Sequence, residues 1–339
     1  MQINLISDTV TIPCDGMLEA MFKAQVGDDV FNEDPTINKL QELSAEMFGM
    51  EAGLFCPSGT MTNQIALACH TERLDEVICH EHSHIFTSEV GGYAYNSNIA
   101  INLLQGEKGK ITAPQVQAAV KPKYDWLANS KLVVLENSTN IGGGSYYELS
   151  EMEAIRGVCD KNGMKLHLDG ARVFNALIES GNTPKEMGQV FHSISICLSK
   201  GLGAPVGSVL LGTKKLIAKA RRLRKAMGGG MRQAGYLAAA GIFALENNVE
   251  RLKEDNDRAK VLGNVLSECD YIENIRAIET NIIIFDVKES TTAKIFLDYL
   301  KKHDILAVAF GPQTLRFVTH KHITDEMIQK VSEALRNFK

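Results

Sequence analysis

The sequence predicts an α/β protein with two parts, a large unit built on a mostly parallel mixed sheet flanked by helices and a small C-terminal α/β unit. Short apolar runs alternate with helix-length segments from about residue 50 onward, which is typical of strands joined by helical crossovers. The 339 residues are enough for about two units of roughly 150 residues each. Because 45% of the residues are apolar and 23% are charged, an ordinary globular core is expected.

The large unit is expected to span residues 1–245. Its strands are predicted where short apolar runs occur, at 53–56, 76–79, 99–104, 131–136, 165–169, 194–198 and 207–212. Residues 213–269 are predicted to be mostly helical, because they are rich in Ala, Leu, Lys, Arg and Glu, with a break at the three glycines 228–230.

The small unit is expected to span residues 246–339, where the pattern of the sequence changes. Strands are predicted at 281–285, 305–309 and 314–319, and helices at 292–302 and 325–338. This spacing predicts a compact α/β unit of its own.

The charge balance gives no reason to expect nucleic acid or an anionic membrane as a partner. Lys and Arg number 36 against 41 Asp and Glu, a net charge of −5, so no large basic field exists to attract a polyanion. The one basic cluster, residues 221–225, is expected to lie on a solvated helix face.

A cytoplasmic location is predicted. No segment approaches the ~18 apolar residues that span a bilayer, and residues 1–8 lack a charged stretch followed by an apolar one. The seven cysteines are odd in number and lie in apolar runs, which indicates reduced thiols in a core.

Lys200 is the first candidate for chemistry. It follows an apolar strand and precedes the glycine-rich stretch 201–207. Open α/β sheets bind ligands at the carboxyl edge of their strands, where this lysine would lie. On position alone, Lys200 either serves chemistry or simply ends a strand.

Asp169 changes the interpretation of that lysine. It ends the apolar strand before Lys200, one strand-crossover unit upstream. An acid at this place can cap the next helix. It can also hold the pyridinium proton of pyridoxal phosphate, whose chemistry requires a carboxylate at the ring nitrogen and a lysine that forms a Schiff base.

Ser58, Gly59 and Thr60 supply the third requirement, a phosphate site. They follow the strand-like run 53–56 and open the helix-like run 62–69. Free N–H groups at a helix start bind phosphate, and the two hydroxyl groups add donors. Alone, this motif equally describes an ordinary helix cap.

In the order phosphate loop, histidine, Asp-x-x-Arg and Ser-Lys, the chain resembles a fold-type I pyridoxal-phosphate enzyme and, more narrowly, the threonine aldolase family. The resemblance covers nearly the whole chain. It rests on residues 7–11, 26–30, 33–36, 58–61, 83–86, 169–172, 198–202, 205–208, 228–233 and 316–320.

The resemblance implies a role for each matching position. For the cofactor ring, it implies that Lys200 forms the Schiff base, Asp169 pairs with the pyridine nitrogen, Arg172 contacts the phenolic oxygen and His84 stacks on the ring. For the phosphate, it implies binding by Gly59 and Thr60, helped by Arg232 from a neighbouring subunit. The substrate carboxylate is then bound by Ser7 and Arg316. Arg316 suits that task because its planar fork binds a carboxylate bidentately. Shared active sites imply a homo-oligomer, a dimer or a homotetramer.

The histidines His80, His82 and His84 alternate along the chain in a pattern that raises the question of a metal site. Ser83 is expected to cap a helix that begins near His84, which breaks the period of two that a strand requires. We therefore expect no metal here, and we expect His80 and His82 to be surface or loop residues.

Four places depart from the family pattern, at Ile6, at Phe31-Asn32, at Thr139 and at Thr87-Ser88. The Thr139 position matters most, because the family has a histidine there near the substrate β-hydroxyl group. Its loss leaves His84, the cofactor phosphate or a water to accept the hydroxyl proton. If this departure limits the enzyme, a histidine restored at Thr139 is expected to raise activity on threonine.

The resemblance implies a lyase that cleaves a β-hydroxy-α-amino acid of the L-threonine or L-allo-threonine type to glycine and an aldehyde. The alternatives are β-elimination or cleavage of a different β-hydroxy amino acid, because Thr139, Phe31 and Ile6 depart from the pattern. A non-catalytic pyridoxal-phosphate-binding protein is a third reading, disfavoured by the presence of Lys200.

Overall fold

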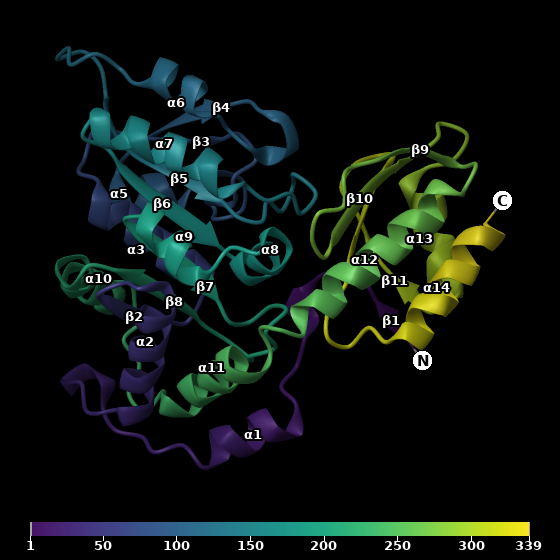
Figure 1. Cartoon of the computed structure of the whole chain (residues 1–339), viewed down its shortest axis with the longest axis horizontal. Coiled ribbons are helices and arrows are strands. Elements are labelled where there is room, and N and C mark those ends of the chain that lie inside the picture. The colour runs from purple at the N-terminus through teal and green to yellow at the C-terminus, as the bar shows by residue number, and fades with distance from the viewer. Residues whose placement is uncertain (1, 339) are drawn as a thin grey trace.

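The computed structural model describes residues 2–338, which form a large and a small lobe lying side by side (Figure 1). The chain begins in the small lobe, builds the large lobe, and returns through helix α12 (Leu252–Ser267). Both ends of the chain therefore lie in the small lobe (Figure 1).

A seven-stranded sheet with the strand order β2-β8-β7-β6-β5-β3-β4 forms the centre of the large lobe. Its strands are β2 (Ala52–Cys56), β3 (Asp75–His80), β4 (Ala100–Leu104), β5 (Asn129–Glu136), β6 (Lys165–Gly170), β7 (Ser193–Cys197) and β8 (Ser208–Gly212). All neighbouring pairs are parallel except those that β8 makes with β2 and β7. The predicted mostly parallel, mixed sheet is confirmed.

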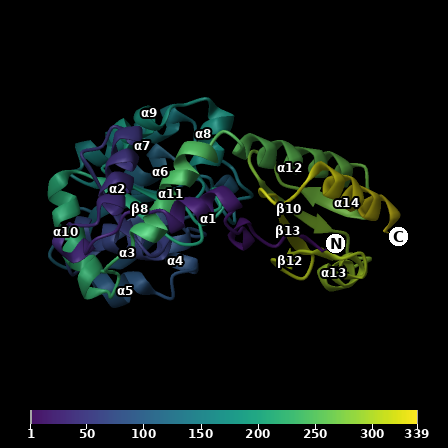
Figure 2. The same cartoon turned by 90° about the horizontal axis from the view of Figure 1, so that it is seen from below.

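Helices cover both faces of this sheet (Figures 1 and 2), as parallel strands require. The helices of the large lobe are α1 (Asp15–Phe22), α2 (Pro35–Phe48), α3 (Gly59–His70), α4 (His84–Thr87), α5 (Gly92–Ser97), α6 (Ala113–Ala119), α7 (Leu149–Lys161), α8 (Val173–Ser180), α9 (Pro184–Val190), α10 (Lys214–Ala226) and α11 (Gly235–Asn247). Short 3-10 turns lie at Asp8–Val10, Asp29–Phe31 and Glu107–Gly109.

Local sequence explains where α2 begins and ends. The Asp34 carboxylate accepts the N–H groups of Thr36 and Ile37, and Pro35 occupies the first helical turn, where its missing N–H costs nothing. At the other end Gly49 takes a left-handed conformation with φ 63°, which glycine adopts without steric cost.

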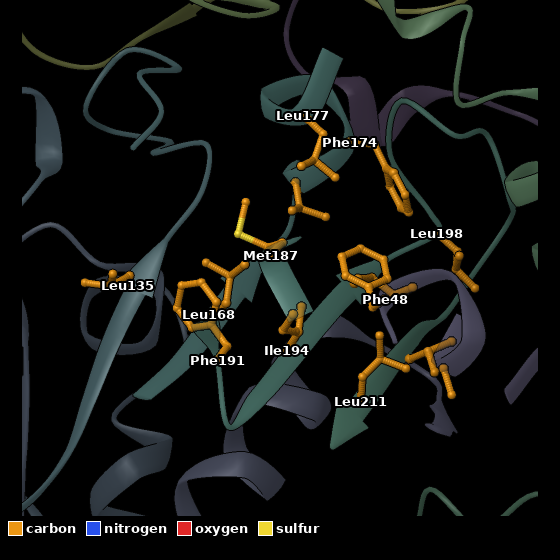
Figure 3. Close-up of a cluster of buried hydrophobic side chains, with 14 of the residues drawn as sticks. Phe48, Leu135, Leu168, Phe174, Leu177, Met187, Phe191, Ile194, Leu198 and Leu211 are labelled. Carbon is orange, nitrogen blue, oxygen red and sulfur yellow. The ribbon is translucent and has the colours of Figure 1, made fainter. Parts of the chain in front are cut away.

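The main hydrophobic core lies between the sheet and the layer that contains α2, α8 and α9 (Figure 3). Phe48 of α2 packs edge-on against Phe174 of α8, with ring centroids 5.7 Å apart. Leu168 and Ile194, from the central strands β6 and β7, are fully buried. Each such side chain contributes roughly 1.5–3 kcal/mol, so the strands that lead to the site are held rigidly.

The small lobe is a four-stranded antiparallel sheet with the order β12-β13-β10-β9, packed against helices. Its elements are α12, β9 (Ile272–Ile275), β10 (Ile282–Val287), α13 (Ala293–Lys302), β11 (Ile305–Leu306), β12 (Val308–Ala309), β13 (Thr314–Val318) and α14 (Asp325–Asn337). Its core is separate from that of the large lobe.

The N-terminal strand β1 (Ile3–Asn4) pairs in parallel with β11, and Ile3 and Leu5 lie in the core of the small lobe. The division at residue 245 stays a prediction, but these first residues pack with the C-terminal unit. The predicted strand at 305–309 is two short strands, because β11 pairs with β1 while β12 pairs with β13.

The basic cluster 221–225 is not entirely solvated, contrary to expectation. Arg224 is buried and binds the Asp29 carboxylate at 2.5 Å, and Arg221 binds the same residue. A buried cation requires such a partner. The cysteines are unpaired within residues 2–338, and four of the seven are buried while Cys14 is exposed. In that same range, no helix combines the length and apolar character needed to cross a membrane.

Candidate active site

A cavity of about 170 Å³ lies at the carboxyl edge of the large sheet and brings five of the predicted residues together. Gly59, Thr60, His84, Asp169 and Lys200 all line it. They come from α3, α4, the end of β6 and the loop after β7. The structure thus joins the predicted phosphate loop, histidine, acid and lysine in one place.

Asp169 is buried at the end of β6. Its Oδ2 accepts a hydrogen bond from Asn63 Nδ2 at 2.8 Å, and its Oδ1 accepts the Ala171 N–H at 3.2 Å. Both hydrogen bonds fix the orientation of the side chain. Asp169 therefore presents a carboxyl group in a fixed position to the cavity.

The Asn63 side chain is itself contacted by His167, whose Nε2 lies 3.3 Å from Asn63 Oδ1. Burial lowers the pKa of His167 to about 4, against the smaller opposing effects of the Asp169 charge and a hydrogen bond to Ser193, so the ring is neutral. A neutral ring can donate from only one nitrogen. His167 Nδ1 lies 3.1 Å from the Ser193 carbonyl oxygen, which can only accept, while the Asn63 amide nitrogen donates to Asp169 Oδ2.

The predicted phosphate loop is the start of α3. Ser58 is the N-cap, and its hydroxyl oxygen accepts the Met61 N–H at 3.2 Å. Within residues 2–338, the N–H groups of Gly59 and Thr60 have no acceptor. The buried Ser208 hydroxyl also lacks a partner there, and a Cβ added at Gly59 would lie 3.4 Å from it. These free donors suit an anion such as phosphate.

Lys200 lies in the loop after β7, where the Thr11 hydroxyl donates to its carbonyl oxygen at 2.7 Å. Lys200 lines the cavity, and its side-chain nitrogen has no hydrogen-bond partner among residues 2–338. An amine held this way is available to react or to bind a ligand.

His84 begins α4, as predicted, although the Ser83 side chain makes no capping hydrogen bond. The ring is 30% exposed, with Nδ1 2.9 Å from Glu89 Oε1. Its backbone N–H donates to Glu136 Oε2 at 2.8 Å. Burial favours a lower pKa for His84, but the hydrogen bond to Glu89 and the charges of Asp169, Glu89 and Glu136 outweigh it and raise the pKa above its ordinary value.

The other two histidines point elsewhere, so the three rings do not share one site. His80 Nε2 lies 3.0 Å from the Gly106 carbonyl oxygen, and His80 Nδ1 accepts the His82 N–H at 3.0 Å. His80 is buried, contrary to the expectation of a surface residue, because it ends β3 beneath that loop. His82 is exposed, as expected.

Arg172 is buried and binds Asp8 through two parallel hydrogen bonds, from Nε to Oδ2 at 2.7 Å and from one terminal nitrogen to Oδ1 at 2.8 Å. Burial alone would raise the pKa of Asp8, but Arg172, with contributions from Lys200 and Asn281, lowers it to about 2. The predicted contact of Arg172 with a cofactor oxygen stays a prediction, and Asp8 fixes the direction of its guanidinium group.

Arg316, from β13 of the small lobe, approaches the N-terminal segment of the chain. It donates to the Asn140 side-chain oxygen at 2.8 Å and to the Ile6 carbonyl oxygen at 2.9 Å, while its buried Nε lacks a partner within residues 2–338. Burial and the nearby Arg172 charge lower the pKa of Arg316 to about 10 despite Asp8. The guanidinium group therefore stays charged at neutral pH and retains a donor for an anion.

Ser7 is also buried, and its hydroxyl oxygen accepts the N–H of Thr9 at 3.2 Å and the Thr9 hydroxyl at 2.9 Å. Arg232 lies outside the cavity, is 62% exposed and binds Asp28 at 2.9 Å. The contacts predicted for both residues, with a substrate and with a neighbouring subunit, stay predictions.

Thr139 lies in a confined place, where its hydroxyl donates to the Lys108 carbonyl oxygen at 3.0 Å. A Cβ at Gly109 would come within 3.1 Å of Thr139 Cβ, and one at Gly142 within 2.3 Å of its hydroxyl oxygen. The position has little room for a larger side chain.

Sequence reasoning missed four polar residues that hold the site: Asp8, Asn63, Glu89 and Glu136. Asn63 belongs to the predicted helix after the phosphate loop, and its distance from that loop could have placed it on the face toward the sheet. Glu89 has no local signal, because its partners His84, Asn63 and Gln64 come together only through the fold.

A lysine, a buried acid and a helix start with free N–H groups, gathered at the carboxyl edge of a mostly parallel sheet, define a fold-type I pyridoxal-phosphate enzyme. The chain belongs to the beta-eliminating lyase family, whose profile matches residues 4–290. The resemblance predicted from the motifs is thereby confirmed.

Similar proteins and a similar solved structure carry the name threonine aldolase. The chain is 40% identical over 337 residues to the low specificity L-threonine aldolase of Escherichia coli K12, covering 99% of both chains. It is 41% identical over 336 residues to the probable low-specificity L-threonine aldolase 2 of Arabidopsis thaliana, covering 97% of this chain and 95% of the relative. The Leishmania major threonine aldolase structure has the same fold, with a TM-score of 0.86 at 21% identity and 98% coverage of both chains.

Proposed function

We propose that this protein cleaves a β-hydroxy-α-amino acid, of the L-threonine or L-allo-threonine type, to glycine and an aldehyde with pyridoxal phosphate as cofactor. The observation that carries the proposal is the convergence of Lys200, Asp169, His84 and the free N–H groups of α3 on one cavity. The names of the relatives from Escherichia coli and Arabidopsis thaliana support it.

The donor set suits pyridoxal phosphate at each end. Lys200 would hold the cofactor through its side-chain nitrogen, and Asp169 would keep the pyridine nitrogen protonated. Gly59 and Thr60 would bind the phosphate, helped by the orphaned hydroxyl of Ser208. When bound, pyridoxal phosphate supplies a sink for the electrons of the bond that breaks at Cα.

Two residues with fixed positions would orient the substrate. Arg316 would bind its carboxylate, together with Ser7, and thereby align the Cα–Cβ bond for cleavage. The Arg316 guanidinium group is already held by Asn140, by the Ile6 carbonyl and by the Phe310 ring, whose centroid lies 4.5 Å away. Such preorganisation can contribute several kcal/mol to catalysis.

His84 would stack on the cofactor and accept the proton of the substrate β-hydroxyl group. Its Nδ1 is engaged by Glu89, which leaves Nε2 as the nitrogen able to accept. Thr139 is unsuited to this task because its hydroxyl already donates to a carbonyl oxygen. Arg172 would contact the phenolic oxygen of the cofactor while bound to Asp8.

A second candidate function is β-elimination, or cleavage of a different β-hydroxy amino acid, on the same scaffold. The observation that favours it is the absence of a basic side chain at Thr139, together with the departures at Ile6 and Phe31. A site that lacks the histidine implied by the resemblance at this position would act on a substrate with a different leaving group or a different side chain.

We also propose a homo-oligomer, a dimer or a homotetramer, in which Arg232 reaches a neighbouring active site. Its exposure and its absence from the lining of its own cavity support this arrangement. The free thiols support action in the cytoplasm.

A panel of β-hydroxy amino acids, assayed for each product, tests the function. Glycine and an aldehyde are expected from L-threonine or L-allo-threonine. A 2-oxo acid and ammonia in their place would establish elimination instead. A purified protein that stays colourless after incubation with pyridoxal phosphate would contradict the cofactor assignment.

A further inference from the structure

We propose that Glu89 is a positioning residue, which fixes the orientation of the His84 ring and keeps a proton on Nδ1, so that Nε2 faces the substrate as the proton acceptor. This inference rests on the proposed function, because it assigns the group that prepares His84 for it. It adds a buried carboxylate to the machinery of the site.

The contacts of Glu89 account for this role. The carboxylate is buried and receives three side-chain donors, with His84 Nδ1 and Asn63 Nδ2 each 2.9 Å from Oε1 and Gln64 Nε2 2.6 Å from Oε2. An ionised carboxylate only accepts hydrogen bonds, so the His84 nitrogen that faces it must carry a proton. A buried carboxylate with three donors has no freedom to turn toward another partner.

The backbone around Glu89 is built to hold this arrangement. Glu89 lies in the turn between α4 and α5, where its carbonyl oxygen accepts the Gly92 N–H at 2.9 Å. A Cβ added at Gly92 would come within 2.8 Å of the Gln64 amide group. The glycine therefore leaves the space that Gln64 needs to reach Glu89.

Glu89 is also linked to the acid that faces the cavity. Asn63 Nδ2 donates to Glu89 at 2.9 Å and to Asp169 at 2.8 Å, so one amide group bridges the two buried carboxylates. The Asn63 amide group thereby also keeps the carboxylates of Glu89 and Asp169 apart. The orientation of the histidine and that of Asp169 are thus set by a single connected network.

Charge at Glu89 must affect how His84 titrates. The groups that face the ring are Glu89 from the turn after α4, Asp169 at the end of β6, Glu136 at the end of β5 and Lys200 in the same cavity. Burial lowers the pKa of His84, while the hydrogen bond to Glu89 and the three carboxylates raise it more. Removal of the Glu89 charge should therefore lower the pKa of His84.

The test replaces Glu89 by glutamine, which keeps the size of the side chain and removes its charge. In the holoenzyme labelled with ¹³C at the histidine rings, the His84 resonance is assigned from the signal lost in His84→Phe. We expect the pKa of His84 to fall by about one unit or more in Glu89→Gln. Since a base works in its deprotonated form, the acidic limb of the kcat/KM profile should move to lower pH by a similar amount.

Turnover should also respond in a way that a purely structural role does not predict. We expect kcat of Glu89→Gln to fall at least about tenfold with little change in KM. The reason is that His84 then acts in the reaction step as a weaker and less firmly oriented base. Glu81→Gln, a matched change at a side chain that contacts Gln105 and not His84, should leave both values unchanged.

An unchanged His84 pKa in folded Glu89→Gln would overturn the inference. Glu89→Asp keeps the charge and serves if the glutamine variant unfolds. In Glu89→Asp, the pKa of His84 should stay above that of a free histidine, and a lowered value would count against the proposal. The ring titration needs no substrate, so a wild-type enzyme that releases no glycine would refute the proposed function while leaving this result readable.

Discussion

The buried pair of Asp8 and Arg172 ties the N-terminal segment to the start of α8, directly after the strand β6 that carries Asp169. Two parallel hydrogen bonds of 2.7 and 2.8 Å join them, and Asn281 of the small lobe reaches the same carboxylate at 3.3 Å. Because both ions are buried, each depends on the other. Asp8 thus controls where Arg172 points.

Replacement of Asp8 by asparagine should lower the free energy of unfolding by about 3–5 kcal/mol at pH 7, because it leaves a buried guanidinium group unpaired. The pKa of Asp8 lies below its ordinary value of 3.8, at about 2. Its stabilising effect is therefore present above pH 3.8 and is lost as the pH falls toward 2.

Urea unfolding of the wild type and of Asp8→Asn at pH 7, 5 and 3 measures this dependence. The difference between the two proteins should be similar at pH 7 and 5 and smaller at pH 3. The exposed Asp125→Asn serves as the control and should shift nothing. A difference that grows toward pH 3 would contradict the assignment of the pair.

Thr139 carries a prediction that reverses the one made from sequence. Its surroundings at Lys108, Gly109 and Gly142 leave little room for an imidazole ring. Thr139→His should therefore cost about 1–3 kcal/mol of stability through overpacking and should not raise activity on L-threonine.

Thr139→Val keeps the volume of the side chain and removes only its hydroxyl group. In thermal melts and glycine-release assays it therefore separates the loss of the hydroxyl group from the overpacking caused by histidine. We expect it to lose one buried hydrogen bond, about 1 kcal/mol, with turnover unchanged. A gain in turnover on L-threonine by Thr139→His would show that the missing histidine does limit the enzyme.

At the scale of the elements, one carboxylate caps two helices. Asp34 accepts the Thr36 and Ile37 N–H groups at the start of α2, and its Oδ2 accepts the Gly235 N–H at the start of α11 at 2.9 Å. Gly235 has no room for a side chain, because a Cβ there would lie 2.4 Å from Asp34 Oδ1. The helix-cap motif therefore also fixes how α11 meets α2.

Asp34→Ala should lower the free energy of unfolding by at least about 2 kcal/mol, since a single cap contributes about 1 kcal/mol and this residue also satisfies a buried N–H of a second helix. Chemical denaturation of the variant measures the loss. Thr324→Ala, the cap of α14 alone, is the comparison and should cost about 1 kcal/mol. Equal losses in the two variants would contradict the double role.

Local pattern predicted the strands around the site but not how distant ones pair. The runs that end in Asp169 and precede Lys200 are short and apolar, so β6 and β7 were recognisable. The pairing of β1 with β11 was not, because a two-residue strand has no periodicity and its partner lies some 300 positions away. Glu89 was missed for the same reason, since its partners meet only in three dimensions.

At the scale of the whole molecule, the proposed substrate-binding end of the site lies where the two lobes meet. Arg316 comes from the small lobe, Asn140 from the large lobe and Ile6 from the segment that crosses between them (Figure 1). The cofactor end, with Lys200 and Asp169, lies wholly in the large lobe. If Arg316 binds the substrate as proposed, recognition of the substrate depends on how the lobes are held together.

The central claim is retro-aldol cleavage that depends on Lys200, and the yield of glycine and aldehyde from L-threonine and L-allo-threonine tests it most directly. The wild type should release the two products in equal amounts. Lys200→Ala should be slower by roughly a thousandfold or more, while the exposed Lys253→Ala should match the wild type. Full activity in Lys200→Ala, or release of ammonia and a 2-oxo acid in place of glycine, would contradict the account.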